Sequence, residues 1–138
     1  MIFVEGLPKP QGSKRAFAVK MKSGKTRAVV VESAGKDLAA WRYAVREKAK
    51  EAGGKMIAGG SPVYVVARFM LPRPKSRKNE LWCATRPDID KLARSLLDSL
   101  TGVAYEDDCQ VVDLKTVKCY ILPGQVPGAS IDWGELSE

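Results

Sequence analysis

Asp90-Lys-Leu-Ala-Arg-Ser-Leu-Leu-Asp-Ser-Leu100 is the stretch of this sequence with the clearest periodicity. At about 100° per residue, its four leucines and Ala93 fall on one arc of a helix. The charged residues fall on the other arc, together with Ser95 and Ser99, which we expect on the solvent side. The stretch therefore predicts an amphipathic helix that packs its leucines on a core and ends at Gly102.

The segments before this helix predict strands, a second helix and a loop. Residues 1–5 predict a short strand, and residues 15–21 and 27–31 predict a hairpin whose turn lies at residues 22–25. Residues 35–52 predict a helix, since apolar residues including Trp41 recur every three or four positions before Gly53. Residues 62–71 predict a buried strand, and the prolines of residues 72–78 predict an exposed basic loop.

The segments after the helix complete an α+β pattern. Residues 111–122 predict a strand, and residues 129–133 predict a short edge strand before a frayed end. With 138 residues and no long linker, the chain predicts a single domain over residues 1–138. We expect a mixed β-sheet of about five strands and two main helices.

The composition excludes several kinds of chemistry. The chain has no histidine, which excludes Ser-His-Asp and Cys-His catalysis and zinc sites that use histidine. Its three cysteines form no Cys-x-x-Cys pair, which is typical of a reduced intracellular protein. No apolar run is long enough to span a membrane and no secretory signal is visible, so we expect a cytoplasmic protein.

Positive charge is concentrated in the first half of the chain. Residues 1–78 hold 18 basic and 5 acidic side chains, whereas residues 79–138 hold 5 basic and 11 acidic ones, within a net charge of +7. This asymmetry fits an anion-binding surface beside an acidic cluster, and it also fits a soluble basic domain without a nucleic-acid partner.

Two groups of carboxylates flank the predicted helix. Asp88 and Asp90 are two residues apart in a stretch that Pro87 keeps extended, so their side chains point the same way. Glu106, Asp107 and Asp108 follow the helix, in a loop that can fold back toward the first pair. Clustered carboxylates repel one another, and Mg²⁺ or Mn²⁺ bound to their oxygens would offset this repulsion. Such a metal can assist phosphodiester cleavage, with Arg94 contacting the phosphate.

Each of these acids also has an ordinary structural interpretation. Asp90 can cap the helix, Asp88 can be a turn residue, and residues 106–108 can be a solvated charged loop. Asp98 is four residues from Arg94 and is interpreted as its ion-pair partner. An EF-hand and a phosphate-binding P-loop are excluded, because the required glycines are missing.

Two longer motifs resemble one known family. Residues 87–100, Pro-Asp-Ile-Asp-Lys-Leu-Ala-Arg-Ser-Leu-Leu-Asp-Ser-Leu, are followed by Gly102-Val and by Tyr-Glu-Asp-Asp-Cys-Gln-Val at residues 105–111. Together with the opening Gly-Leu-Pro-Lys-Pro-Gln-Gly-Ser-Lys-Arg at residues 6–15, they closely resemble the RusA family of Holliday-junction resolvases. The resemblance implies a homodimeric, Mg²⁺-dependent endonuclease of bacteria or their phages that cuts four-way DNA junctions by paired incisions in recombination and repair.

The resemblance also implies residue roles. Asp88, Asp90 and Asp108 fall on the family's catalytic acids, and these three with Asp107 would hold the metal. The family's catalytic lysine falls on Arg94, which keeps the charge but is a poorer proton donor. The family's usual Asn falls on Lys91, which on the helix lies near Asp98; it could supply an amine, or be an exposed lysine bonded to water.

The basic segments then have a role in binding DNA. Phosphate contacts are expected from cations of the opening segment, the basic loop and the helix: Lys14, Arg15, Arg73, Lys75, Arg77, Lys78 and Lys91. Lys20 and Lys22 remain open between DNA contact and a solvated strand face. Trp41 is expected in the core, and Trp82 either stacks at a junction or makes a surface or dimer contact.

Two alternatives to a junction resolvase remain from the sequence. A catalytically silent protein that binds branched DNA would explain the arginine at position 94. A general nuclease with little preference for junctions would use the same acids.

Overall fold

The computed structural model describes residues 1–12, 14–20, 24, 26–32 and 35–137, which form an α+β fold. The strands are β1 (Ile2–Glu5), β2 (Lys14–Lys20), β3 (Thr26–Glu32), β4 (Val63–Leu71), β5 (Val111–Tyr120) and β6 (Gly128–Glu135). The helices are α1 (Gly35–Glu51), α2 (Ile89–Leu100) and a short 3₁₀ helix, η1 (Asp108–Gln110). The predicted fold class and the two main helices are confirmed. None of the described helices has the length and apolar character that a bilayer crossing requires.

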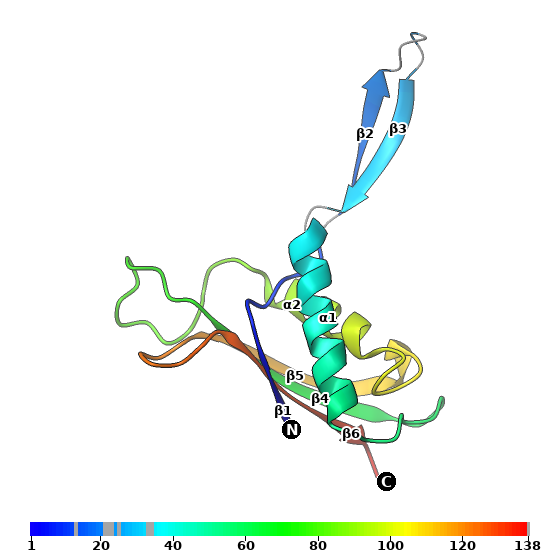
Figure 1. The fold of residues 1–138 in the computed structure, drawn as a ribbon, viewed down its shortest axis with the longest axis vertical. Helices are drawn as coiled ribbons and strands as arrows, with labels where there is room; N and C mark the ends of the chain where they lie inside the picture. The colour runs from blue at the N-terminus through cyan, green and yellow to red at the C-terminus, as the bar shows by residue number, and fades with distance from the viewer. Residues whose placement is uncertain (13, 21–23, 25, 33–34, 138) are drawn as a thin grey trace.

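Four strands form one mixed sheet, in the order β1-β6-β4-β5. β4 runs parallel to β5, and β6 runs antiparallel to both β1 and β4. The prediction of a single sheet of about five strands was wrong, because β2 and β3 form a separate two-stranded sheet. Figure 1 shows this hairpin extending away from the body of the molecule, beyond the start of α1.

The hairpin itself agrees with the sequence. β2 and β3 pair antiparallel, with Phe17 opposite Val29, within one residue of the expected strand limits. Gly24 has a positive φ of 83°, as tight turns between strands require. The other residues of the expected turn, including Lys22 and Lys25, lie outside the described residues.

β6 lies inside the sheet, between β1 and β4, and is not the short edge strand expected at residues 129–133. Glycines allow neighbouring aromatic side chains to cross it. A Cβ atom on Gly128 would lie 2.7 Å from Cζ of Phe3, and one on Gly134 would lie 2.8 Å from Cε1 of Tyr64. β6 is thus an interior strand with small residues where Phe3 and Tyr64 cross it.

α1 and α2 lie on the same face of the sheet and enclose the core (Figure 1). The residues that are fully enclosed there include Val45 of α1, Val63, Val65 and Phe69 of β4, and Leu92, Leu96 and Leu100 of α2. Trp41 is 3% exposed and belongs to this core, as its helical spacing predicts. The core fixes α2 against the sheet, and α2 begins at the first pair of acids.

Candidate active site

Asp88 and Asp90 lie at the N-terminal end of α2, which begins at Ile89. Asp88 is the N-cap residue, and its carbonyl accepts a hydrogen bond from the amide of Leu92 at 3.1 Å. The expectation that Asp90 caps the helix was wrong, because Asp90 is in the first turn. The carboxylate of Asp88 makes no capping hydrogen bond, although Asp commonly does so at this position. Both acids are exposed, so their carboxylates are accessible to a ligand.

Asp88 lines an open cavity together with two cationic residues. The ammonium of Lys91 lies 3.9 Å from Oδ2 of Asp88, one turn along the helix. The cavity has a volume of about 410 Å³ and is lined by Pro10, Arg86, Pro87, Asp88 and Lys91. Lys91 is half-buried, and its ammonium pairs with Asp88. It is therefore not the fully exposed lysine that the sequence allowed. A guanidinium, an ammonium and a carboxylate together suit a phosphate group accompanied by a divalent cation.

The N-terminal segment forms one wall of this cavity because α2 holds its backbone. The amide of Gln11 donates to the carbonyl of Lys91 at 2.9 Å, and the hydroxyl of Ser95 donates to the carbonyl of Lys9 at 2.7 Å. The expectation that Ser95 and Ser99 face solvent was wrong, since both are fully buried. Ser99 bonds to the carbonyl of Ser95 at 2.6 Å, so both hydroxyls are satisfied by the backbone.

Lys118 of β5 holds the segment that leads into Asp88. Its ammonium donates to the carbonyl oxygen of Pro87 at 2.7 Å and to that of Thr85. The hydroxyl of Thr85 also lies 3.2 Å from the hydroxyl of Tyr120, two residues further along β5. The backbone next to Asp88 is therefore fixed to the sheet, independently of α2.

A Lys118→Met variant should cleave DNA at least about tenfold more slowly, with KM for DNA close to the wild-type value. Methionine retains the aliphatic stem but cannot donate to the two carbonyls, and small misplacements of catalytic groups have large kinetic costs. Lys118→Arg should recover part of kcat, because a guanidinium can also donate to carbonyl oxygens. Steady-state cleavage kinetics, which give kcat and KM separately, would measure this, with exposed Lys115→Met as the control. An unchanged kcat in Lys118→Met would contradict the positioning role.

The second group of acids forms a turn that a buried glutamine stabilises. Gln110 is 6% exposed, and its carbonyl oxygen accepts from the amides of Glu106 and Asp107 at 3.0 and 2.9 Å. Its side-chain NH₂ donates to the carbonyls of Ala58 and Ser61. Asp107 caps η1 by accepting from the amide of Cys109 at 3.0 Å. The turn thus has a defined backbone conformation.

The carboxyls of Asp107 and Asp108 interact with each other. The hydrogen bond from the backbone of Cys109 lowers the pKa of Asp107. Desolvation raises the pKa of Asp108, and the hydrogen bond and charge of Asp107, followed by the charge of Asp98, raise it further. The charge of Asp107 is thus one part of the shift at Asp108, and a divalent cation bound to the two carboxyls would offset that repulsion.

The two groups of acids lie toward opposite ends of α2. The hydroxyl of Tyr105, which begins the turn, donates to the carbonyl of Leu97 at 2.8 Å near the C-terminal end of α2. Asp98 is eight positions beyond Asp90, a helical rise of about 12 Å. Over residues 1–12, 14–20, 24, 26–32 and 35–137, no three His, Cys, Asp or Glu side chains come together as a metal site would require. The loop therefore does not bring Asp107 and Asp108 to the Asp88–Asp90 pair within this chain.

Arg94 is exposed on α2, one turn beyond Asp90. Among the described residues no ion pair joins it to Asp98, so the interpretation of Asp98 as its partner was wrong. Asp98 instead lies near Asp108 and Tyr105. The guanidinium of Arg94 is accessible to a phosphate.

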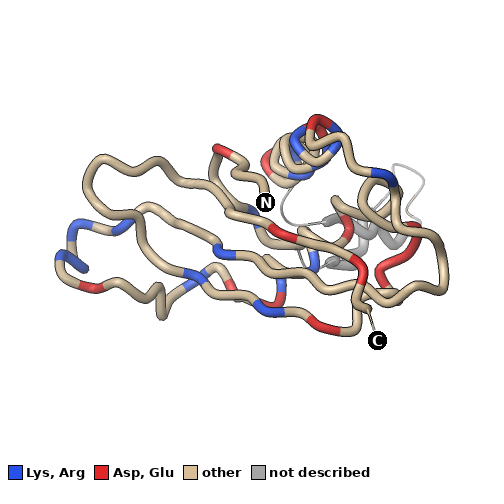
Figure 2. The backbone as a smooth tube through the Cα atoms, turned by 90° about the horizontal axis from the view of Figure 1, so that it is seen from below, with Lys and Arg blue, Asp and Glu red and all other residues tan. Residues whose placement is uncertain are grey.

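The expected basic loop is present between β4 and α2. Its cations form the blue group at one end of the molecule in Figure 2. Arg77 is held by Glu80 at 3.1 Å, Arg73 is half-buried, and Lys75 and Lys78 are exposed. Lys14 and Arg15 lie at the start of β2, where only the backbone is described.

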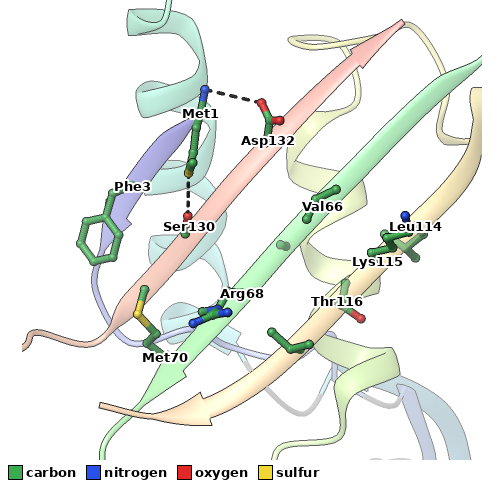
Figure 3. A pocket seen from close by; sticks show the side chains of 12 residues that line it. Met1, Phe3, Val66, Arg68, Met70, Leu114, Lys115, Thr116, Ser130 and Asp132 are labelled. Atoms are coloured by element: carbon green, nitrogen blue, oxygen red, sulfur yellow. Dashed lines mark hydrogen bonds and ion pairs between the residues drawn. The ribbon is translucent and has the colours of Figure 1, made fainter. Parts of the chain in front are cut away.

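A second, larger groove lies on the other face of the sheet (Figure 3). It has a volume of about 980 Å³ and is mostly apolar, with Phe3, Val66 and Val117 among its lining residues. The N-terminal amino group of Met1 pairs with Asp132 at 3.5 Å beside it. The groove contains none of the acids discussed above, so its size does not identify the candidate active site.

Sequence reasoning missed the supporting residues Lys118, Gln110 and Ser95. Lys118 and Ser95 bond to carbonyls that are 31 or more residues away in sequence, and no local pattern identifies such partners. Gln110 is part of the quoted motif at residues 105–111, which was the available signal for its role.

Comparison with known proteins shows what this chain is similar to. Residues 8–131 match the family described as endodeoxyribonuclease RusA. An alignment of 70 positions with 36% identity relates this chain to a Bacillus subtilis (strain 168) protein called uncharacterized protein YqaN, and it covers 43% of this chain and 49% of that protein. The match thus spans about half the length of this relative. The family match covers both groups of acids and the N-terminal wall, and the chain therefore belongs to the RusA family of endodeoxyribonucleases.

Proposed function

We propose that this chain is a Mg²⁺-dependent endodeoxyribonuclease that resolves four-way DNA junctions in recombination and repair, in the cytoplasm of a bacterium or a phage-infected cell. The observation that carries the proposal is the exposed carboxylate of Asp88, which does not cap α2 and shares a cavity with Arg86 and Lys91. Membership of the RusA family supports a nuclease with this type of substrate.

The residues at the start of α2 fit a magnesium ion. Mg²⁺ in phosphoryl-transfer sites usually has one or two carboxylate ligands, and water and phosphate oxygens complete its shell. Asp88 and Asp90 would provide these carboxylates. Asp107 and Asp108 lie toward the other end of α2 and would not reach the same ion within one chain. Bound Mg²⁺ would supply Lewis-acid stabilisation of the charge that develops on the phosphate. Mn²⁺ is the expected substitute because it accepts the same oxygen ligands.

The other residues bind and orient the DNA. Arg86 and Lys91 would contact a phosphate in the cavity, and Arg94 would contact one beside it. Lys118 would keep the backbone before Asp88 in place. Lys75 and Lys78 would neutralise phosphates of a junction arm, so the affinity for DNA should decrease as the salt concentration rises.

We also propose that the active species is a homodimer, because paired symmetric incisions require two active sites. Two chains of 15.1 kDa would sediment together at the protein concentrations used for cleavage. Analytical ultracentrifugation measures this state without DNA.

A cleavage assay with labelled four-way, flap and duplex DNA tests the function. The wild-type protein should cut the four-way junction in Mg²⁺ or Mn²⁺ and not in EDTA, with little cutting of the duplex. Equal cutting of all three substrates would indicate a general nuclease instead.

The arginine at position 94 favours one other function, a protein that binds branched DNA without cutting it. Under our proposal Arg94→Lys should change the cleavage rate by less than about tenfold, since both side chains carry the charge that contacts phosphate. The measurement is single-turnover cleavage of the junction. If the wild-type protein does not cut the junction and the Arg94→Lys variant does, the alternative is established and the proposal is contradicted.

A further inference from the structure

A second cavity lies directly beside the one that Asp88 lines. This proline cavity has a volume of about 260 Å³, and its lining includes five proline rings, those of Pro8, Pro10, Pro72, Pro74 and Pro87. Three residues, Pro10, Arg86 and Pro87, line both cavities, so the two adjoin along a shared wall. A nucleotide with its phosphate at Asp88 therefore has an adjacent group within reach of the proline cavity.

The floor of the proline cavity lies at the carboxyl ends of two parallel strands. Leu71 ends β4, Tyr120 ends β5, and the two are partners in the parallel register. Together with Cys83 they form a small cluster of buried residues, separate from the main core. Tyr120 is two residues beyond Lys118 and shares its face of β5, so the cavity is on the side where Lys118 holds the segment before Asp88. In open sheets, ligands commonly bind beyond the carboxyl ends of parallel strands.

The walls of the proline cavity are fixed before any ligand binds. Lys118 donates to the carbonyls of Thr85 and Pro87 on one side, and Ser95 donates to the carbonyl of Lys9 on the other. The proline rings also fix the φ angles of their own residues. A ligand in this cavity therefore orders few protein groups, which favours its binding.

Two hydroxyls give the apolar cavity a polar edge. The hydroxyl of Thr85 lies 3.2 Å from the hydroxyl of Tyr120, and both residues line the cavity. The thiol of Cys83 lies 3.8 Å from the same Thr85 oxygen. A hydroxyl can donate one hydrogen bond and accept two, so these contacts leave lone pairs that can accept from a ligand N–H. Apolar walls with a few polar groups are typical of ligand sites.

The size and chemistry of the proline cavity suit a nucleobase. Its volume is below the range of about 300–1,000 Å³ that is typical of sites for drug-sized ligands, so a double helix cannot enter. Proteins hold an extruded base between apolar or aromatic side chains and form hydrogen bonds to its polar edge. The exposed guanidinium of Arg86 lies on the shared wall, where it can contact the phosphate of the same nucleotide.

We propose that the proline cavity holds the base of a nucleotide that adjoins the phosphate bound at Asp88. The inference rests on the proposed function, since it takes branched DNA as the ligand, and it adds a site for one base. Extrusion of a base costs least where the base is already unpaired or unstacked. The cavity thus favours cleavage beside a branch point over cleavage within a continuous duplex.

The test compares intact four-way junctions with junctions that lack one base, in EDTA, so that binding is measured without cleavage. The missing base is moved through each position within two nucleotides of the branch point. At one of these positions the wild-type protein should bind the abasic junction about tenfold more weakly than the intact one, because the contacts to the base are lost.

Two variants assign this difference to the proline cavity. Leu7 lines the cavity and is 45% exposed, and a tryptophan there should occupy the space, so Leu7→Trp should bind intact and abasic junctions alike. Leu122→Trp is the matched control, because Leu122 is 51% exposed, lies outside the cavity and also precedes a proline. It should keep the tenfold difference. Thr85→Val, which removes one hydroxyl, should weaken binding of the intact junction about threefold and leave binding of the abasic junction unchanged.

Equal binding of intact and abasic junctions by the wild-type protein would overturn the proposal. An equal difference in Leu7→Trp, Leu122→Trp and Thr85→Val would also overturn it, since the base would then be bound elsewhere. Cleavage in Mg²⁺ by a protein that fails these binding tests would leave the proposed function intact. Absence of cleavage by a protein that passes them would contradict only the proposed function.

Discussion

An Asp88→Asn variant should cleave a four-way junction at least about a hundredfold more slowly than the wild-type protein, and Asp90→Asn should behave alike. Asparagine has nearly the same shape as aspartate but carries no charge, so it is a weak ligand for Mg²⁺. Because the Asp88 carboxylate does not cap α2, the substitution removes no hydrogen bond that holds the helix. The loss should therefore appear in cleavage and not in folding.

DNA binding separates this interpretation from a general effect on the protein. Both variants should bind the junction as tightly as the wild type or slightly more tightly, since each removes a negative charge beside phosphates. Single-turnover cleavage and gel-shift titrations measure the two properties. Asp113→Asn, on β5 and outside both acidic groups, is the matched control and should cleave normally. Wild-type cleavage by Asp88→Asn would show that Asp88 is not part of the metal site.

Leu96→Ala should destabilise the protein by about 3 kcal/mol, a large share of the stability of a domain of this size. Leu96 is fully buried in the core between α2 and the sheet, and its truncation leaves a cavity that rigid neighbours do not fill. The melting temperature should decrease by roughly 10 °C. Because α2 carries Asp88 and Asp90 at its start, cleavage should decrease at temperatures where the wild type is still folded.

Chemical denaturation followed by circular dichroism measures this effect. Leu81→Ala is the matched control, because Leu81 is 47% exposed and the same truncation there should cost less than about 0.5 kcal/mol. Equal stability of the two variants would show that α2 contributes little to the cooperative core.

α2 shows how much local sequence can predict. Leu92, Leu96 and Leu100 recur at helical spacing and are all fully buried, so periodicity identified both the helix and its core face. Ser95 shows the limit of this reasoning, because its hydroxyl is buried against the carbonyl of Lys9 from a distant segment. Polarity alone assigned it to solvent, and only the position of the N-terminal segment explains its burial.

Strand partners show the same limit. The hairpin of β2 and β3 was predictable because a short turn brings the two strands together. The place of β6 between β1 and β4 was not, since strand pairing over long separations depends on packing of the whole core. Gly128 and Gly134 gave no sign in sequence that they allow Phe3 and Tyr64 to cross the strand.

By itself, the sequence determined the α+β class, the two helices and the motif at residues 87–111 that identifies the family, because periodicity and motif spacing are local properties. Only the tertiary structure decided that Asp88 shares a cavity with Arg86 and Lys91, that Lys118 holds the carbonyl of Pro87, and that the acidic groups lie toward opposite ends of α2. These relations join residues far apart in the chain. They depend on how helices and strands pack, which no local pattern contains.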